Sequence, residues 1–444
     1  MRICEYVNMI MCKKIDFKTN ESLYTATTME YSQLSKELTN KISKPDKKKN
    51  GIYFTPPSCV NNTIHLLQSY FKTAKNVLEP SYGSGEYVTA IHREYPNIKI
   101  TGIEYYKPIY ESTRHLQNDN VALHNMDFLK YKTDVMYDII ISNPPYYVMK
   151  KEDVGKEYRA YFDGRPNIFI LFLIKSERHL NTGGVMSFIL PKNFLNCLYY
   201  DKTRKFIAQH FKILHIVDCV DDKYIETQQD TINLIIQKSE SIQKSESIQK
   251  SDKNSAFILE NNKYTIFATP DIKQKITKLY ENSSSLFELG FKVSVGNVVW
   301  NQCKDILTDD ATKTRLIYSS DIQDNTLIIK KYTNDDKKNY INKPGTTRPM
   351  IVINRGYGVG EYKFNFSIIN EEKEYLVENH LICIEAKEND NMPREMLLEA
   401  YKKIVISLNN KKTTEFIAIY FGNNAINTTE LNHILPIYGG GEAK

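Results

Sequence analysis

The chain has 444 residues, of which 41% are hydrophobic and 25% charged, and this length and composition are typical of a globular protein with two domains. No apolar run approaches the roughly 20 residues that a membrane-spanning helix needs, and the apolar character of the N-terminus is interrupted by Glu5 and Asn8, which argues against a signal peptide. The formal net charge of +6 permits contact with nucleic acid without requiring it. The seven cysteines include no C-x-x-C pair, so we expect reduced thiols rather than a zinc knuckle or a disulfide framework.

Residues 1–50 are predicted to form a lead-in segment ahead of the first domain. This segment ends in a lysine-rich stretch, Lys44–Lys49, which Pro45 and Asp46 interrupt. We interpret the stretch as a solvated loop, with contact to a DNA phosphate as the alternative.

Residues 51–236 alternate short apolar runs with amphipathic stretches, a pattern that predicts a mostly parallel sheet covered by helices on both faces. Helices are expected over Pro57–Phe71, Glu86–His92 and Ile168–Leu180. Strands are expected at Val77-Leu78, Ile98–Ile103, Val121–His124, Asp138–Ile141, Val185–Leu190, Leu214–Val217 and Ile232–Ile236.

A polar repeat separates this domain from the rest of the chain. Residues 237–254 repeat a six-residue unit with a single isoleucine, which cannot bury enough surface to pack, so we predict a linker or surface loop. Residues 255–444 then carry short β-branched and aromatic runs between turn residues, which predicts a second, α+β domain. The runs include Phe291–Trp300, Thr326–Tyr332, Met350–Asn354 and His380–Glu385.

The most specific motif is Asn143-Pro144-Pro145-Tyr146, which follows three isoleucines of a predicted buried strand. The prolines remove two backbone donors, so the turn offers acceptors: the Asn143 side-chain oxygen and the Pro144 carbonyl. Two acceptors would hold the hydrogens of a planar amine and favour its tetrahedral form as a methyl group approaches, while Tyr146 supplies a face for stacking a base.

A second motif surrounds a glycine turn between a predicted strand and a helix. Glycines at Gly83 and Gly85 let the backbone approach a ligand, and the helix N-terminus that follows attracts an anion. Glu104 lies roughly 20 residues further on, at a strand end where a ribose-binding acid is expected. Asp127, with Phe128 beside it, follows the next strand and could accept a hydrogen bond from an adenine amine.

In this order the motifs resemble those of the gamma-class N6-adenine DNA methyltransferases of restriction–modification systems and large DNA viruses, in which a Thr-Pro-Pro element comes first, here Thr55-Pro56-Pro57. The resemblance implies a Rossmann-like S-adenosylmethionine-dependent methyltransferase fold over 51–236 and a DNA target-recognition domain over 255–444. It assigns catalysis to Asn143, Pro144, Pro145, Tyr146 and Tyr224, the last as a ring against the flipped base. It assigns cofactor binding to Thr55, Glu79, Pro80, Ser81, Gly83, Gly85, Glu104, Asp127, Phe128 and Asn143. One departure is the bulky Tyr82, which could narrow the methionine pocket or point outward.

We therefore expect an S-adenosylmethionine-dependent enzyme that flips an adenine out of double-stranded DNA and methylates its N6 amine. Arg348 and Arg355 are the predicted DNA contacts, the latter in a glycine-rich turn. We expect no metal, no membrane, a cognate restriction endonuclease acting independently as a possible partner, and a location in the cytoplasm or in the host-cell compartment that holds the DNA.

Two alternatives stay open at this point. The same turn occurs in glutamine-N5 protein methyltransferases and in some RNA adenine methyltransferases, because an amide nitrogen poses the same chemical problem. The chain could also be a catalytically silent nucleic-acid-binding relative that has kept the fold.

Overall fold

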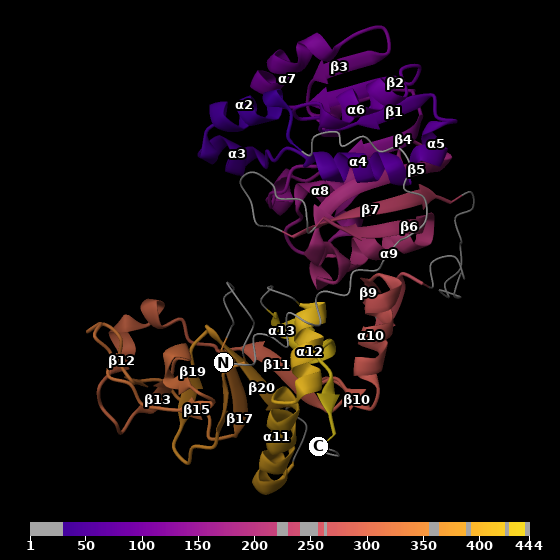
Figure 1. Ribbon diagram of the computed structural model, residues 1–444. Coiled ribbons are helices and arrows are strands. Elements are labelled where there is room, and N and C mark those ends of the chain that lie inside the picture. The colour runs from indigo at the N-terminus through magenta and orange to yellow at the C-terminus, as the bar shows by residue number, and fades with distance from the viewer. Residues whose placement is uncertain are drawn as a thin grey trace, which may run out of the picture.

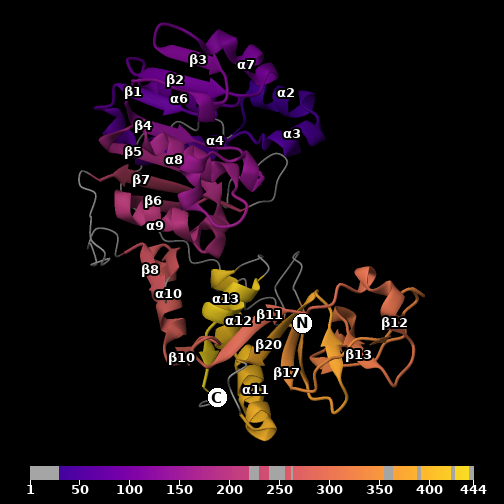
Figure 2. The same ribbon diagram turned by 180° about the vertical axis from the view of Figure 1, so that it is seen from behind.

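The computed structural model describes residues 30–219, 230–239, 256–261, 264–354, 364–387, 392–421 and 426–439. Figure 1 shows two lobes, and the opposite view in Figure 2 shows the same division. The first lobe contains β1 to β7, and the second contains the elements from β10 onward, with α10 (Pro270–Tyr280) descending from one lobe to the other.

The first lobe is built on a seven-stranded sheet in the order β3-β2-β1-β4-β5-β7-β6. β7 runs antiparallel to both of its neighbours, while the pairs among β3, β2, β1, β4 and β5 are parallel. This order confirms the predicted Rossmann-like methyltransferase fold. The strands are β1 (Asn76–Glu79), β2 (Lys99–Glu104), β3 (Val121–Asn125), β4 (Tyr137–Ser142), β5 (Leu180–Pro191), β6 (Phe211–Asp218) and β7 (Thr231–Lys238).

Apolar side chains on alternate positions of the central strands enter two separate cores. Val77, Ile139 and Ile141 pack on one face of the sheet, and Leu78 and Ile140 pack on the other. Burial on both faces explains why these strands are continuous apolar runs rather than alternating ones. The covering helices are α4 (Pro57–Leu66), α5 (Gln68–Phe71), α6 (Glu86–Glu94), α7 (Lys107–Thr113), α8 (Ile168–Glu177) and α9 (Asp201–His210).

The lysine-rich stretch near the N-terminus is helical, so its interpretation as a loop was wrong. It forms α3 (Lys44–Asn50), which follows α2 (Gln33–Lys41), and Pro45 falls in the first turn, where a missing N–H costs nothing. Lys47 is buried, and its Nζ donates to the Thr39 carbonyl at 2.6 Å. At least part of this stretch therefore serves packing rather than contact with a phosphate.

The second lobe has the α+β character that its sequence predicts. One four-stranded sheet contains β11 (Phe291–Val295), β20 (Leu381–Ala386), β17 (Met350–Asn354) and β18 (Phe366–Ile369). Another contains β12 (Leu307–Thr308), β16 (Tyr340–Ile341), β13 (Thr314–Ile317) and β19 (Tyr375–Val377). Three helices pack beside them: α11 (Arg394–Leu408), α12 (Lys411–Tyr420) and α13 (Thr428–His433).

Short strand pairs complete the fold. They are β8 (Ile258–Asn261) with β9 (Tyr264–Phe267), β10 (Ser283–Ser284) with β21 (Ile437–Tyr438), and β14 (Ile322–Gln323) with β15 (Thr326–Leu327). Two predicted strands are shorter than expected. Trp300 lies outside β11, in a 3-10 turn where it packs against a small core, and only Thr326 and Leu327 of the run Thr326–Tyr332 are paired.

At the junction between the lobes, the buried Arg204 of α9 holds the loop that follows β5 and the strand β9. Its Nη1 donates to the carbonyls of Phe194 and Cys197 at 2.8 Å, and its Nε donates to the Thr265 carbonyl of β9 at 2.5 Å. Nearby, the Tyr420 hydroxyl of α12 donates to the Asn196 carbonyl at 3.2 Å. The loop that follows β5 is therefore hydrogen-bonded to elements on both sides of the joint.

Candidate active site

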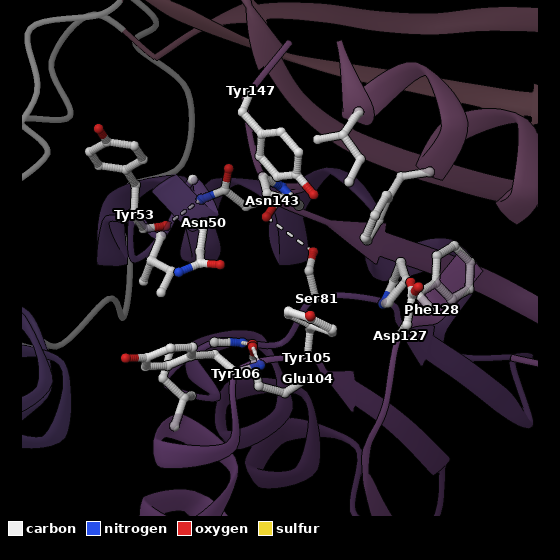
Figure 3. Close-up of a pocket in the computed structure, with 18 of the residues that line it drawn as sticks. Asn50, Tyr53, Ser81, Glu104, Tyr105, Tyr106, Asp127, Phe128, Asn143 and Tyr147 are labelled. Carbon is white, nitrogen blue, oxygen red and sulfur yellow. Dashed lines mark hydrogen bonds between the residues drawn. The ribbon is translucent and has the colours of Figure 1, made fainter. Parts of the chain in front are cut away.

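A cavity of about 380 Å³ opens at the carboxyl ends of β1, β2 and β4, where the strand order reverses and doubly wound folds bind their ligands. It is lined by the glycine turn, the ends of β2 and β3, the Asn-Pro-Pro-Tyr turn, the start of α8 and the segment between α3 and α4. Figure 3 shows Asn143, Ser81, Glu104 and Asp127 arranged around this space.

The glycine turn presents Pro80, Ser81 and Gly83 to the cavity. Gly83 has a φ of +56°, and its N–H donates to Glu104 Oε2 at 3.1 Å. Gly85, which is predicted to contact the cofactor, has a φ of +80°, a backbone conformation that favours glycine. It does not line the cavity, and a Cβ there would lie 2.6 Å from a methyl carbon of Leu116.

Tyr82 points into the core rather than into the cavity, which resolves the departure noted in the sequence. The residue is buried, and its hydroxyl lies 2.9 Å from Thr113 Oγ1 on α7. Its ring occupies the space above Gly102, where a Cβ would lie 2.8 Å from a ring carbon. Tyr82 therefore leaves the cavity open.

Glu104 is the acid at the end of β2. Its Oε1 accepts from the Tyr106 N–H at 2.7 Å, and with the Gly83 bond both oxygens are held by backbone donors. Burial raises the pKa of Glu104 to about 7, although these backbone hydrogen bonds oppose the shift. Since an ionised carboxylate has about four lone-pair sites, two stay available for hydroxyl groups of a ligand.

Glu79, another predicted cofactor contact, lies behind the turn instead. It is buried and does not line the cavity, and burial raises the pKa of its carboxyl well above the usual range. A hydrogen bond from the backbone of Val88 in α6 opposes that shift. Glu79 therefore supports the helix that follows the glycine turn.

Asp127 and Phe128 both line the cavity, and their contact with a cofactor stays a prediction. Asp127 Oδ1 accepts from the Leu129 N–H at 2.9 Å, which fixes the carboxylate and leaves Oδ2 for a ligand. Phe128 packs against Phe172 of α8 with their ring centroids 5.1 Å apart, and both rings face the cavity together with Ile168. The helix α8, which begins at Ile168, therefore contributes an aromatic wall.

The Asn-Pro-Pro-Tyr turn contributes Asn143 and Pro145 to the cavity wall, whereas Pro144 is buried and Tyr146 lies behind them. The Tyr146 hydroxyl lies 2.8 Å from the Ile189 carbonyl and 3.1 Å from Asn143 Oδ1, and its ring meets Phe169 edge-on. Ser81 ties this turn to the glycine turn, because its hydroxyl donates to the Asn143 carbonyl at 3.1 Å.

Thr55 occupies a different place from the one predicted. It is buried and does not line the cavity; instead its hydroxyl oxygen accepts from Asn143 Nδ2 at 3.2 Å. The same Nδ2 donates to the Tyr53 carbonyl at 3.0 Å. Thr55 therefore contacts the Asn-Pro-Pro-Tyr turn in this structure rather than the cavity.

Several lining residues lack a motif that would have identified them. Tyr147 points into the cavity from the turn, and Tyr105 and Tyr106 lie opposite, beside Glu104 (Figure 3). Their positions next to two recognised motifs were the only available signal. Lys49, Asn50, Ile52, Tyr53, Met126 and Met149 also line the cavity.

Two predicted site residues, Tyr224 and Arg355, lie outside the described residues. Arg348 is half-buried in the second lobe, where its N–H donates to Thr346 Oγ1 at 3.0 Å and its carbonyl accepts from Tyr375. Contact of Arg348 with DNA stays a prediction. Within the described ranges, no group of three or more His, Cys, Asp or Glu could hold a metal ion, and no helix is long and apolar enough to cross a membrane.

Comparison with known proteins supports the resemblance seen in the motifs. Residues 22–225 match the profile of the Eco57I restriction-modification methylase family. The chain is 25% identical to the type II methyltransferase M.CvrRI of Paramecium bursaria Chlorella virus XZ-6E, over 92% of this chain and 99% of that protein. It is 28% identical to M.AccI of Acinetobacter calcoaceticus, over 42% of this chain and 36% of that protein.

Among solved structures, one similar protein is a putative class I S-adenosylmethionine-dependent methyltransferase from Listeria monocytogenes. The two are 20% identical with a TM-score of 0.40, and the match covers 46% of this chain and 65% of that one.

Proposed function

From this relationship to restriction–modification DNA methyltransferases, we propose that the protein methylates the N6 amine of adenine in double-stranded DNA. One observation carries the proposal: Asn143 and the glycine turn at Gly83 line one cavity, together with Glu104 and Asp127. An acceptor for an aromatic amine thus lies next to a site that suits a nucleoside.

The residues around the cavity fit S-adenosylmethionine. Glu104 can accept from ribose hydroxyls, Asp127 Oδ2 can accept from the adenine amine, and Phe128 with Phe172 offers apolar walls for the purine. When bound, the cofactor supplies a methyl group on a positively charged sulfur. On transfer the bond from the methyl group to sulfur would break as the bond to the amine nitrogen forms, so the positive charge passes to that nitrogen. Its proton becomes acidic and can leave to water, so the chain is not required to provide a strong base, and positioning supplies most of the rate.

Asn143 has the central role in this proposal. Its Oδ1 accepts a hydrogen of the amine and holds the nitrogen in line with the methyl group, with the Pro144 carbonyl as the second acceptor. The target adenine must leave the base stack to reach this point. Tyr146 and Tyr224 are proposed to support the extruded base, and stacking of roughly 1–3 kcal/mol per ring offsets part of the cost of unstacking.

The second lobe is proposed to recognise the DNA target, with Arg348 and Arg355 in contact with DNA. The match to a viral type II methyltransferase extends over 92% of this chain, so it includes residues beyond the catalytic lobe. A protein methyltransferase with only a small appendage beside its catalytic domain would not require that second lobe. A cognate restriction endonuclease acting separately is the proposed partner.

Transfer of a tritiated methyl group to duplex DNA, followed by digestion to nucleosides, tests the proposal directly. We expect label in N6-methyladenine with the wild-type protein and at least a hundredfold lower rate with Asn143→Ala, since both the acceptor and its geometry are lost. Tyr146→Ala should lose turnover while retaining cofactor binding. Label on protein or RNA alone would favour a glutamine or an RNA adenine as the substrate. No label at all would favour a catalytically silent nucleic-acid-binding protein.

A further inference from the structure

The segment Gly51–Thr55, called the strap below, joins α3 to α4 and lies directly against the Asn-Pro-Pro-Tyr turn. Gly51 has a φ of +64°, and a Cβ at this position would lie 2.7 Å from the Tyr146 nitrogen and 3.0 Å from the Pro145 Cβ. Backbone therefore meets backbone here, and a side chain would have to push the two segments apart. Such a close approach is one of the reasons that a fold requires glycine.

The strap also determines which way the Asn143 carboxamide faces. A carboxamide nitrogen carries two hydrogens, and the strap offers two acceptors to it: the Tyr53 carbonyl at 3.0 Å and Thr55 Oγ1 at 3.2 Å. Because a carbonyl can only accept, the nitrogen must face Tyr53, and Oδ1 must face the opposite way. An inverted amide would place oxygen against oxygen.

The Tyr146 hydroxyl lies on the other side of Asn143 and can release Asn143 Oδ1, the oxygen that the proposed reaction needs. Tyr146 has one hydroxyl hydrogen and two acceptors within reach, Asn143 Oδ1 at 3.1 Å and the Ile189 carbonyl at 2.8 Å. When that hydrogen points to Ile189, Oδ1 is available for the amine of a substrate. The strap keeps the amide in place while this exchange occurs.

We propose, on the basis of the proposed function, that the strap is a positioning element for the reaction and that Thr55 acts through Asn143 rather than through the cofactor. Thr55 is thus a positioning residue, since it is buried outside the cavity and contacts the amide that grips the amine.

The helix α2, which precedes α3 and the strap in the chain, is hydrogen-bonded to the glycine turn and to the start of α6. The Ser35 hydroxyl of α2 lies 2.8 Å from Ser84 Oγ and 2.5 Å from Glu86 Oε1. Asn50 and Ile52 line the same cavity. An occupant of the cavity therefore lies against the strap at Ile52.

Thr55→Val and Thr55→Ser in the full chain test this role. Valine keeps the size of threonine but removes the acceptor, whereas serine keeps the acceptor. We expect Thr55→Val to lower the single-turnover rate of methyl transfer roughly tenfold at saturating cofactor, as loss of one buried hydrogen bond implies. The Kd for S-adenosylmethionine should stay within about twofold, and Thr55→Ser should retain most of the rate.

Three results would overturn the proposal. The first is a weaker cofactor Kd for Thr55→Val with an unchanged saturated rate, which would make Thr55 a cofactor contact. The second is a wild-type rate in Thr55→Val. The third is an equal defect in both variants, which would show that the hydroxyl is not the group that matters.

Hydrogen–deuterium exchange separates this inference from the proposed function, because it needs no turnover. Thr55→Val, but not Thr55→Ser, should speed exchange in peptides that cover residues 51–55 and 146–147, while exchange in β1 stays unchanged. Unchanged exchange in those peptides would overturn the role of the strap. A wild-type protein that methylates no DNA would refute only the proposed function.

Discussion

Glu104→Gln is the change for which the structure gives the fullest expectation. Both carboxyl oxygens of Glu104 accept backbone N–H bonds, from Gly83 and Tyr106, and face a cavity that suits a ribose. Glutamine has only one acceptor oxygen, so its amino group must face one of these donors. The variant therefore weakens the support of the glycine turn and removes the charge that would hold the hydroxyl groups.

The pKa of Glu104 predicts how strongly cofactor affinity depends on pH. The pKa of Glu104 in the empty protein is about 7, so about three in four molecules are ionised at pH 7.5 and about one in eleven at pH 6.0. If ribose binds the ionised form, affinity should fall about eightfold between these two values. Loss of a charge-assisted hydrogen bond of about 1.5–3 kcal/mol should weaken binding by Glu104→Gln at least tenfold at pH 7.5.

Isothermal titration of S-adenosylmethionine into both proteins at pH 6.0, 6.75 and 7.5 measures the effect. The variant serves as the matched control, because any pH dependence that it retains belongs to other groups, including the amine of the ligand. An equal pH dependence in the two proteins, or an unchanged affinity in Glu104→Gln, would refute the reasoning.

The raised pKa of Glu104 also makes the free energy of unfolding of the ligand-free protein depend on pH. Between pH 4.5 and 7 the folded protein holds a proton on Glu104 that the unfolded chain has released, so the free energy of unfolding falls as pH rises through this window. The contribution from this group is roughly 3 kcal/mol. Denaturant unfolding at pH 5 and pH 8 should show a smaller difference in Glu104→Gln than in the wild type.

Three further changes have separate expectations. Asp127→Asn keeps an oxygen for the Leu129 N–H but turns an amino group toward the ligand, so cofactor affinity measured by titration should fall roughly tenfold with little change in stability. Tyr82→Phe loses only the bond to Thr113, so denaturant unfolding should show about 1 kcal/mol of destabilisation. The rate of methyl transfer by the folded variant should stay at the wild-type value, and a lower rate would contradict the inward position of the ring. Arg204→Met removes the side-chain donor to the buried carbonyls of Phe194 and Thr265, and calorimetry should show at least about 2 kcal/mol of destabilisation. A wild-type melting curve would rule out the role of Arg204 at the joint.

The first lobe was predictable because its strands and motifs carry strong local signals. Buried runs such as Ile139–Ile141 can only be central strands when both faces are covered. The glycine turn and the Asn-Pro-Pro-Tyr turn then follow strand ends, which a parallel sheet brings to one edge. That rule alone was enough to place Gly83, Glu104, Asp127 and Asn143 around one cavity.

The roles of individual side chains were less predictable, because they depend on contacts between distant segments. Nothing local tells Thr55 to face Asn143 rather than a ligand, or separates Gly83 on the cavity from Gly85 against Leu116. The helix α3 could have been predicted from its ends. Ser43 before it, Pro45 in its first turn and Gly51 after it are recognised signals of helix ends, and they are stronger evidence than the run of lysines that suggested a loop.

The joint at Arg204 has a consequence for building hybrid proteins from relatives. Strand β5 runs from the catalytic lobe through Ile189, which contacts Tyr146, directly into the loop that Arg204 and Tyr420 hold. The contacts that hold the second lobe thus begin within a few residues of Ile189, which is bonded to Tyr146 of the Asn-Pro-Pro-Tyr turn. A graft of a foreign second lobe should therefore carry its own versions of Asn196 and Thr265 as a matched set. A crossover placed between them should misalign the two lobes even if both halves fold.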